Sequence, residues 1–144
     1  MRSPRFSPAV AILSLVACSG GASLSAPIDS LELRRGFFSA QQADRGRQSY
    51  DEVCRECHFL SDFRGRDFEW KWRRQTVWNL YREVSETMPE DKPGELLPAT
   101  VVDIIAYILS LNDYQVGSAD LSTSRAELEE IALGAGVQKT RMKE

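Results

Sequence analysis

Histidine and cysteine are scarce in this sequence. Its 144 residues include one histidine, His58, and three cysteines, at positions 18, 54 and 57. A zinc site needs about four ligands, and Cys18 lies in an N-terminal segment that has a different explanation, given below. Too few ligands therefore remain for a zinc site around the other two cysteines. A thioredoxin-like cysteine pair is expected beside a βαβ pattern, and the sequence shows no such pattern.

Long runs of one kind of residue are also missing. Acidic side chains outnumber basic ones, the net charge is -3, and no long basic run occurs, so the composition does not favour nucleic-acid binding. The apolar run at residues 9–17 is too short to span a bilayer as a helix. No internal repeat is present. A chain of this length suits one small domain with extensions.

The single histidine directly follows a pair of cysteines, in Cys54-Arg55-Glu56-Cys57-His58. On one helical turn, residues i and i+3 lie on the same face, so each thiol can add to one vinyl group of the same porphyrin. The next residue is carried under the ring, where its imidazole can bind the iron as proximal ligand. This spacing indicates a c-type haem attachment site. The one motif predicts one covalently bound haem c, and a disulfide is the simpler alternative.

The identity of the sixth iron ligand follows partly from what is absent. With one histidine, two histidine ligands are excluded within one chain, which leaves methionine, lysine, a chain terminus, water or an open position. Met88 follows a helix-like run and precedes Pro89, whereas Met142 lies in a charged tail and Met1 in a segment expected to be removed. Met88 is therefore the predicted ligand. The alternative is an ordinary core methionine, because methionine fills gaps readily.

The N-terminus is predicted to direct export. Residues 1–8 carry Arg2 and Arg5 without an acidic residue, and the apolar run at residues 9–17 follows. These are the n-region and h-region of a secretory signal peptide. We therefore expect residues 1–17 to be removed and the mature protein to be periplasmic.

The cleavage point has two interpretations. Leu15-Val16-Ala17-Cys18 resembles the lipobox of bacterial lipoproteins, in which the cysteine is lipidated and becomes the mature N-terminus. This predicts a lipoprotein that is anchored to the membrane through Cys18, with residues 18–38 as a tether and linker. Cleavage near Ala22 or Ala26 would instead discard Cys18.

A helix is predicted to lead into the cysteine motif. Ser39 is a good N-cap, and Gln42 is its expected capping-box partner. Gly46 lowers helix propensity, but it would allow close approach of another helix, with Tyr50 one turn further on as the packing ring.

Two further helices are predicted after the motif, at residues 76–87 and at residues 98–111, the second with a wide apolar face. A short tail helix is also possible within residues 121–133. Residues 59–75 are rich in arginine and aromatic rings, and we predict a loop that covers the haem. Trp72 is the first choice in this loop for a contact with a haem propionate.

These features together resemble a class I cytochrome c, in particular the small bacterial monohaem cytochromes and the cytochrome domains of quinone-dependent dehydrogenases. The resemblance spans residues 39–117. The residues that carry it are Gly46-x-x-x-Tyr50, Cys54-x-x-Cys57-His58, Thr87-Met88-Pro89, Pro93-Gly94 with Leu96, and Asp103-Ile104-Ile105-Ala106-Tyr107-Ile108-Leu109 followed by Asn112. The family implies an all-α fold of three main helices around one haem, here with extensions at residues 18–38 and 118–144. It also implies iron ligation by His58 and Met88.

The predicted function is therefore one-electron transfer in an exported redox chain, rather than catalysis. The expected partners are redox proteins, such as a quinone-dependent dehydrogenase or a terminal oxidase. The alternatives are an open-site haem enzyme or gas sensor, and a non-catalytic cytochrome subunit of a membrane-associated complex. One departure from the family stands out, since no proline occurs between His58 and Pro89. Many members use a Gly-Pro carbonyl there to orient the histidine, so the group that orients His58 is not identified by the sequence.

Overall fold

The computed structural model describes residues 36–134, and helices dominate this part of the chain. In chain order the elements are β1 (Phe38–Ser39), α2 (Ala40–Ser49), the π-helical turn η1 (Tyr50–Cys54), the 3-10 turn η2 (Leu60–Phe63), α3 (Gly65–Trp72), α4 (Val77–Thr87), α5 (Pro98–Ser110), β2 (Val116–Gly117) and α6 (Arg125–Glu130). The predicted all-α class is confirmed. The predicted signal peptide, Cys18 and most of the predicted linker lie outside the described residues.

Helix α2 begins at the predicted cap but does not form the predicted capping box. The Ser39 hydroxyl accepts the backbone N–H of Gln42 at 3.0 Å. The Gln42 side chain, which is buried, turns instead to Leu121, where it donates to the carbonyl at 3.1 Å and accepts the N–H at 2.5 Å. A buried amide needs such partners. The expected role of Gln42 was therefore wrong, because it fastens a distant segment rather than its own helix.

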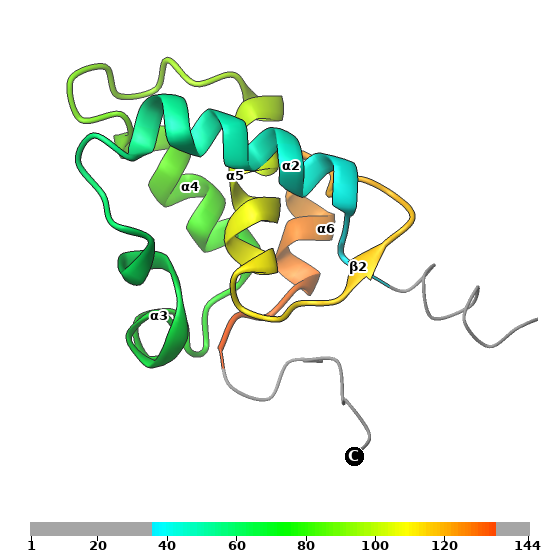
Figure 1. The fold of residues 1–144 in the computed structure, drawn as a ribbon. Coiled ribbons are helices and arrows are strands. Elements are labelled where there is room, and N and C mark those ends of the chain that lie inside the picture. The colour runs from blue at the N-terminus through cyan, green and yellow to red at the C-terminus, as the bar shows by residue number, and fades with distance from the viewer. Residues whose placement is uncertain (1–35, 135–144) are drawn as a thin grey trace, which may run out of the picture.

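Helices α2 and α5 cross in close contact, as Figure 1 shows. A Cβ atom built on Gly46 would lie only 1.8 Å from the carbonyl oxygen of Asp103 in α5. Beside this point the Tyr50 and Tyr107 rings meet with their centroids 5.6 Å apart. The prediction that Gly46 permits helix packing is confirmed, because no side chain fits at the crossing.

The predicted second and third helices are present with nearly the expected bounds. Helix α4 begins after the N-cap Thr76, and its buried residues are Val77, Leu80 and Val84. Helix α5 has Pro at its first position, where the missing N–H costs nothing. Its buried residues are Val101, Val102, Ile104, Ile105, Ala106, Ile108 and Leu109. Together these faces form most of the core. No helix in the described range of 36–134 is both long and apolar enough to cross a membrane.

The predicted loop at residues 59–75 is largely helical, which corrects the sequence analysis. It contains η2 and the two-turn helix α3. Phe68 and Trp72, four residues apart, form the buried face of α3. Helical packing of these two rings gives the segment a buried apolar face, so it forms a helix where the sequence analysis predicted a loop that covers the haem.

The segment that the sequence assigns to a C-terminal extension packs into the same core. Leu121, Leu128 and Leu133 are buried, and β2 pairs in parallel with β1 through Phe38 and Val116. A helix is present within residues 121–133, as expected, and is α6, which packs beside α4. The packed unit therefore continues beyond residue 117, because the helical bundle leaves apolar surface that these leucines cover.

Candidate haem site

The cysteine motif lies at the end of a widened helical turn. In η1 the N–H of Arg55 bonds to the carbonyl of Tyr50 at 3.0 Å, five residues back. The Cys54 carbonyl then accepts the N–H groups of Cys57 at 3.2 Å and His58 at 2.9 Å. The motif therefore folds as one tight turn, as predicted. The π-helical turn before it was not predicted, because apolar periodicity does not distinguish a single wide turn; such turns are frequent at functional sites.

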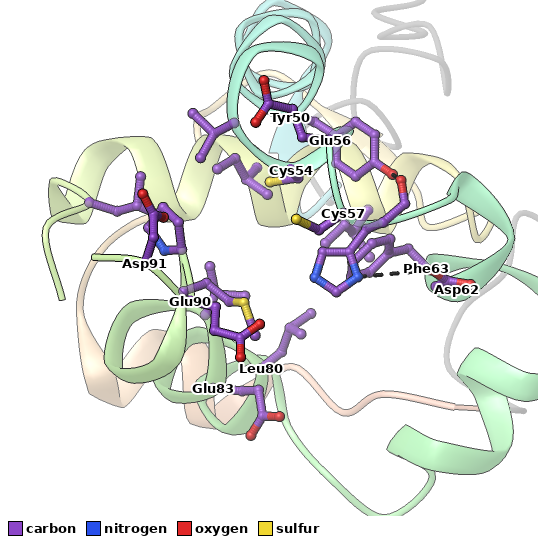
Figure 2. A pocket seen from close by; sticks show the side chains of 18 of the residues that line it. Tyr50, Cys54, Glu56, Cys57, Asp62, Phe63, Leu80, Glu83, Glu90 and Asp91 are labelled. Carbon is purple, nitrogen blue, oxygen red and sulfur yellow. Dashed lines mark hydrogen bonds and ion pairs between the residues drawn. The ribbon is translucent and has the colours of Figure 1, made fainter. Parts of the chain in front are cut away.

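The two thiols are free in the structure and differ in exposure. Cys54 is half-buried and Cys57 is exposed. Burial raises the pKa of the Cys54 thiol to about 11. Figure 2 shows Cys54 and Cys57 next to each other, with both sulfur atoms toward the open centre of one cavity. They are therefore placed to react with one and the same ligand.

His58 is held through its backbone and its ring. The Tyr50 hydroxyl donates to the His58 carbonyl at 3.1 Å, and the Phe63 ring packs edge-on to the imidazole with a centroid distance of 5.2 Å. Tyr50 is almost fully buried, so this hydrogen bond ties the motif to the α2–α5 crossing. Sequence analysis identified Tyr50 only as a packing ring, because nothing in the spacing reveals the hydroxyl's partner.

Met88 reaches the same cavity from a different element. It forms the C-cap of α4, where its N–H bonds to the Val84 carbonyl at 3.1 Å. Its side chain is partly buried against the core. Trp72, the last residue of α3, is 8% exposed and also lines the cavity. The fold thus brings together the cysteine motif, the end of α3 and the end of α4 around one cavity.

A cavity of about 730 Å³ contains all five site residues predicted for the haem. This volume falls within the range of about 300–1,000 Å³ for small-molecule sites. The branched aliphatic side chains that line it are Val53, Leu80, Val84, Leu96, Ile104 and Ile108, and the acidic ones are Glu56, Asp62, Glu83, Glu90 and Asp91. Leu80 and the acidic residues on both sides of the opening can be followed in Figure 2. The lining suits a mostly apolar ligand with a polar edge.

The donor set fits a haem better than a bare metal ion. One cavity offers two thiols, one imidazole and one thioether, from Cys54, Cys57, His58 and Met88. Within residues 36–134, no three His, Cys, Asp or Glu side chains are grouped to hold a metal ion. A haem brings four iron ligands of its own, so it needs only the axial positions from the protein. The roles of the individual residues stay predictions.

Two residues near His58 were missed by the sequence analysis. Asp62 lies four positions after His58, with Oδ2 3.9 Å from Nδ1. Asn112 was named only as one of the residues that carry the family resemblance, without a contact of its own. Its amide donates to the Phe63 carbonyl at 2.7 Å and accepts the Gly65 N–H at 3.1 Å, which fixes the segment after the motif against α5. In the sequence, only the i,i+4 spacing of His58 and Asp62 indicated that these two side chains could approach each other.

An all-α fold with a Cys-x-x-Cys-His turn lining such a cavity defines a class I c-type cytochrome domain. A family model described as "Cytochrome C oxidase, cbb3-type, subunit III" matches residues 41–108. The chain therefore contains a class I c-type cytochrome domain, whose chemistry is haem-based electron transfer. Comparison with curated proteins and with solved structures gave no match.

Proposed function

We propose that the protein is an exported one-electron carrier with a single haem c. Cys54 and Cys57 hold the haem covalently, and His58 and Met88 are the axial ligands of its iron. The observation that carries this proposal is the convergence of these four side chains on one cavity. Met88, at the end of α4, is 30 positions after His58 in the sequence. The fold therefore brings the methionine and the cysteine motif together.

Attachment requires only addition chemistry from the protein. Each thiol would add across a vinyl group: the S–H bond and the π bond of the vinyl group would break, one S–C bond and one C–H bond would form, and no external oxidant or reductant would be needed. When bound, the haem supplies an iron that gains or loses one electron. The apolar side chains that α4 and α5 contribute to the lining would shield it from water. Met88 sulfur would favour the ferrous state and raise the potential. Trp72, which lines the cavity, is the residue that we expect to donate its indole N–H to a propionate.

Two strong axial ligands suit transfer rather than catalysis. With His58 and Met88 both bound, the iron keeps the same ligands in both oxidation states, so little reorganisation accompanies transfer. An open-site enzyme or gas sensor would need Met88 away from the iron and a polar group in its place. The position of Met88 in the cavity lining supports the carrier instead.

The matched family favours a second candidate, a non-catalytic cytochrome subunit of a membrane-bound terminal oxidase. The haem chemistry would be the same, but the partner would be held permanently. The predicted signal peptide and the predicted lipidation of Cys18 place either form at a periplasmic membrane surface. A weak, transient contact is expected for a free carrier, and a stable complex for a subunit.

The test of the ligand assignment is the visible spectrum of the haem-loaded protein, oxidised and reduced, before and after carbon monoxide is added. We expect the weak long-wavelength sulfur-to-iron band in the ferric state and no change of the ferrous spectrum with carbon monoxide. Met88→Ala should remove the band and open the ferrous iron to carbon monoxide. Met142→Ala, which removes a methionine from the tail, is the matched control and should change neither. A wild-type spectrum that is high-spin and shifts with carbon monoxide would refute the carrier.

A further inference from the structure

An iron-bound histidine nearly always donates its other ring nitrogen to a carboxylate, a backbone carbonyl or water, and this partner tunes the metal. We propose that the Asp62 carboxylate is this partner for His58, and that its charge lowers the reduction potential. The inference rests on the proposed role of His58 as an iron ligand. It answers the question left by the missing proline after the motif, because a side chain takes the place of a backbone carbonyl.

Among the described residues 36–134, Asp62 is the residue whose carboxylate pairs with the His58 ring. Its Oδ2 lies 3.9 Å from His58 Nδ1, and Asp62 stands at the edge of the cavity in Figure 2. Within residues 36–134 the imidazole has no other hydrogen-bond or ion-pair partner. A hydrogen bond requires about 2.7–3.2 Å. At 3.9 Å, one bridging water would join the ring nitrogen to the carboxylate, which is 47% exposed and therefore open to solvent.

The two groups are fixed independently of each other. Asp62 Oδ2 accepts the Phe59 N–H at 2.9 Å, while the Asp62 N–H bonds to the Phe59 carbonyl at 3.0 Å. This reciprocal pair fixes the carboxylate on the turn that follows the motif. His58 is held by the Tyr50 hydroxyl and by the edge of Phe63. The approach of ring and carboxylate is therefore built into the backbone rather than left to two mobile side chains.

A charged partner has a different effect from a neutral carbonyl. The carboxylate draws the Nδ1 proton toward itself and makes the imidazole a stronger donor to iron. The ferric state, which carries one more positive charge, is stabilised more than the ferrous state. Asp62 therefore lowers the potential and opposes the effect of the methionine sulfur.

The variant that tests the charge is Asp62→Asn. Asparagine has nearly the same shape and keeps one oxygen to accept the Phe59 N–H, so the turn is retained while the charge is lost. We expect the ferrous-to-ferric ratio at a fixed applied potential to rise about tenfold, which is about 59 mV for one electron. The measurement is a redox titration of the haem-loaded protein, followed by its visible spectrum.

Two control variants separate the contact from general charge effects. Asp67→Asn makes the same change on α3, outside the haem cavity. It should change the ferrous-to-ferric ratio at the same applied potential by less than twofold. Glu90→Gln removes a carboxylate that lines the cavity but does not contact the ring. Its shift should be clearly smaller than that of Asp62→Asn. Equal shifts in Asp62→Asn and Glu90→Gln would overturn the proposal, since charge alone would then account for both.

A second measurement reads the hydrogen bond directly. His58 is the only histidine, so isotope labelling of histidine nitrogen reports a single imidazole in the ferrous protein. We expect the Nδ1 resonance to move in Asp62→Asn and to stay in Asp67→Asn. A wild-type protein with the expected spectrum but no specific response of potential or resonance to Asp62→Asn would refute this inference alone. Absence of the histidine–methionine spectrum in the wild type would refute the proposed function itself.

Discussion

Asp120 joins the C-terminal segment to the start of α2. Its carboxylate accepts hydrogen bonds from the Ser39 hydroxyl and from the Arg45 guanidinium, the latter at 2.7 Å. Arg45 also binds Asp103 of α5, with Nε 2.9 Å from Oδ2. The hydrogen bond from Ser39, and then that from Arg45, hold the pKa of Asp120 below its usual value. One carboxylate thus connects β1, α2 and the chain beyond β2.

This lowered pKa predicts a pH dependence of stability. A carboxyl group whose pKa is lower in the folded state stabilises the fold above its unfolded pKa of about 3.9. That contribution is lost as the pH falls through the lower, folded-state value. Asp120→Asn should therefore reduce the free energy of unfolding at neutral pH by about 0.5–1 kcal/mol, since the side chain is half-exposed and screened by solvent. The difference from wild type should shrink below about pH 4.

Denaturant unfolding of the haem-loaded protein at neutral and acid pH measures this difference. Glu127→Gln, on the exposed side of α6, is the control because no hydrogen bond or ion pair of its side chain is found within residues 36–134. It should unfold like wild type at both pH values. If Asp120→Asn loses the same stability at acid and neutral pH, the ionic contribution is absent and only packing is affected.

At the scale of elements, the α2–α5 crossing depends on one missing side chain. In an exposed helix, Gly→Ala stabilises by about 1 kcal/mol through helix propensity. At position 46 the new Cβ would meet the Asp103 carbonyl at 1.8 Å, so the helices must separate. Overpacking of this kind costs about 1–3 kcal/mol. Gly46→Ala should therefore destabilise the protein, opposite in sign to its effect on an isolated helix.

Thermal unfolding of Gly46→Ala, followed at the haem absorbance, tests this sign. Gln48→Ala lies on the exposed side of the same helix and is the control for propensity, with little change expected. A stabilised Gly46→Ala would mean that the glycine is merely tolerated. The displacement of α2 in Gly46→Ala should also alter the haem site, because Tyr50 and Cys54 follow directly after this helix.

The three main helices were predictable because each combines a local start with a periodic apolar face. Ser39, Thr76 and Pro98 mark the starts, and residues three or four apart supply the buried faces. Helix α3 was missed because its apolar residues are rings set among arginines, and composition outweighed the i,i+4 pair of Phe68 and Trp72. Apolar periodicity identifies the buried face of a long helix, but it does not distinguish a two-turn helix from a loop.

The candidate site was predictable where the chemistry fixes the spacing. Two thiols and a histidine must lie on one turn to serve one haem, so Cys54, Cys57 and His58 could be assigned together. Met88 followed from the scarcity of other ligands. The surroundings of His58 could not be predicted, because the position of Asp62 depends on a 3-10 turn and on its own bond to the Phe59 N–H. Such partners are set by backbone geometry rather than by residue pattern.

At the scale of the molecule, the start and the end of the described chain are in contact with each other, away from the cavity. Helix α6 packs beside α4, whereas strand β1 contacts α2 and pairs with β2. Hydrogen bonds from Gln42 to Leu121 and from Ser39 to Asp120 hold the C-terminal segment against the start of α2. The cavity opens between α4, the motif and the loop after Met88. No residue of the C-terminal segment 115–134 lines the cavity, so the cavity opening and this segment occupy different parts of the surface.

The predicted membrane attachment is a property of the whole molecule, and it would depend on lipidation of Cys18. Each buried CH₂ of an acyl chain contributes about 0.8 kcal/mol to membrane binding, so a lipidated Cys18 would keep an otherwise water-exposed domain on the membrane. Cys18→Ser should move the haem protein from the membrane to the soluble periplasmic fraction and abolish incorporation of labelled fatty acid. Ser23→Ala, in the predicted tether, is the control and should stay in the membrane fraction.

The distribution of the haem stain between fractions distinguishes the two interpretations of the cleavage point. A wild-type protein that is soluble, with a mature N-terminus beyond residue 22, would refute lipidation while leaving the haem chemistry intact. A Cys18→Ser protein that stays on the membrane without fatty acid would contradict the lipid anchor in another way. It would indicate a protein partner there, which is the behaviour expected of an oxidase subunit rather than of a free carrier.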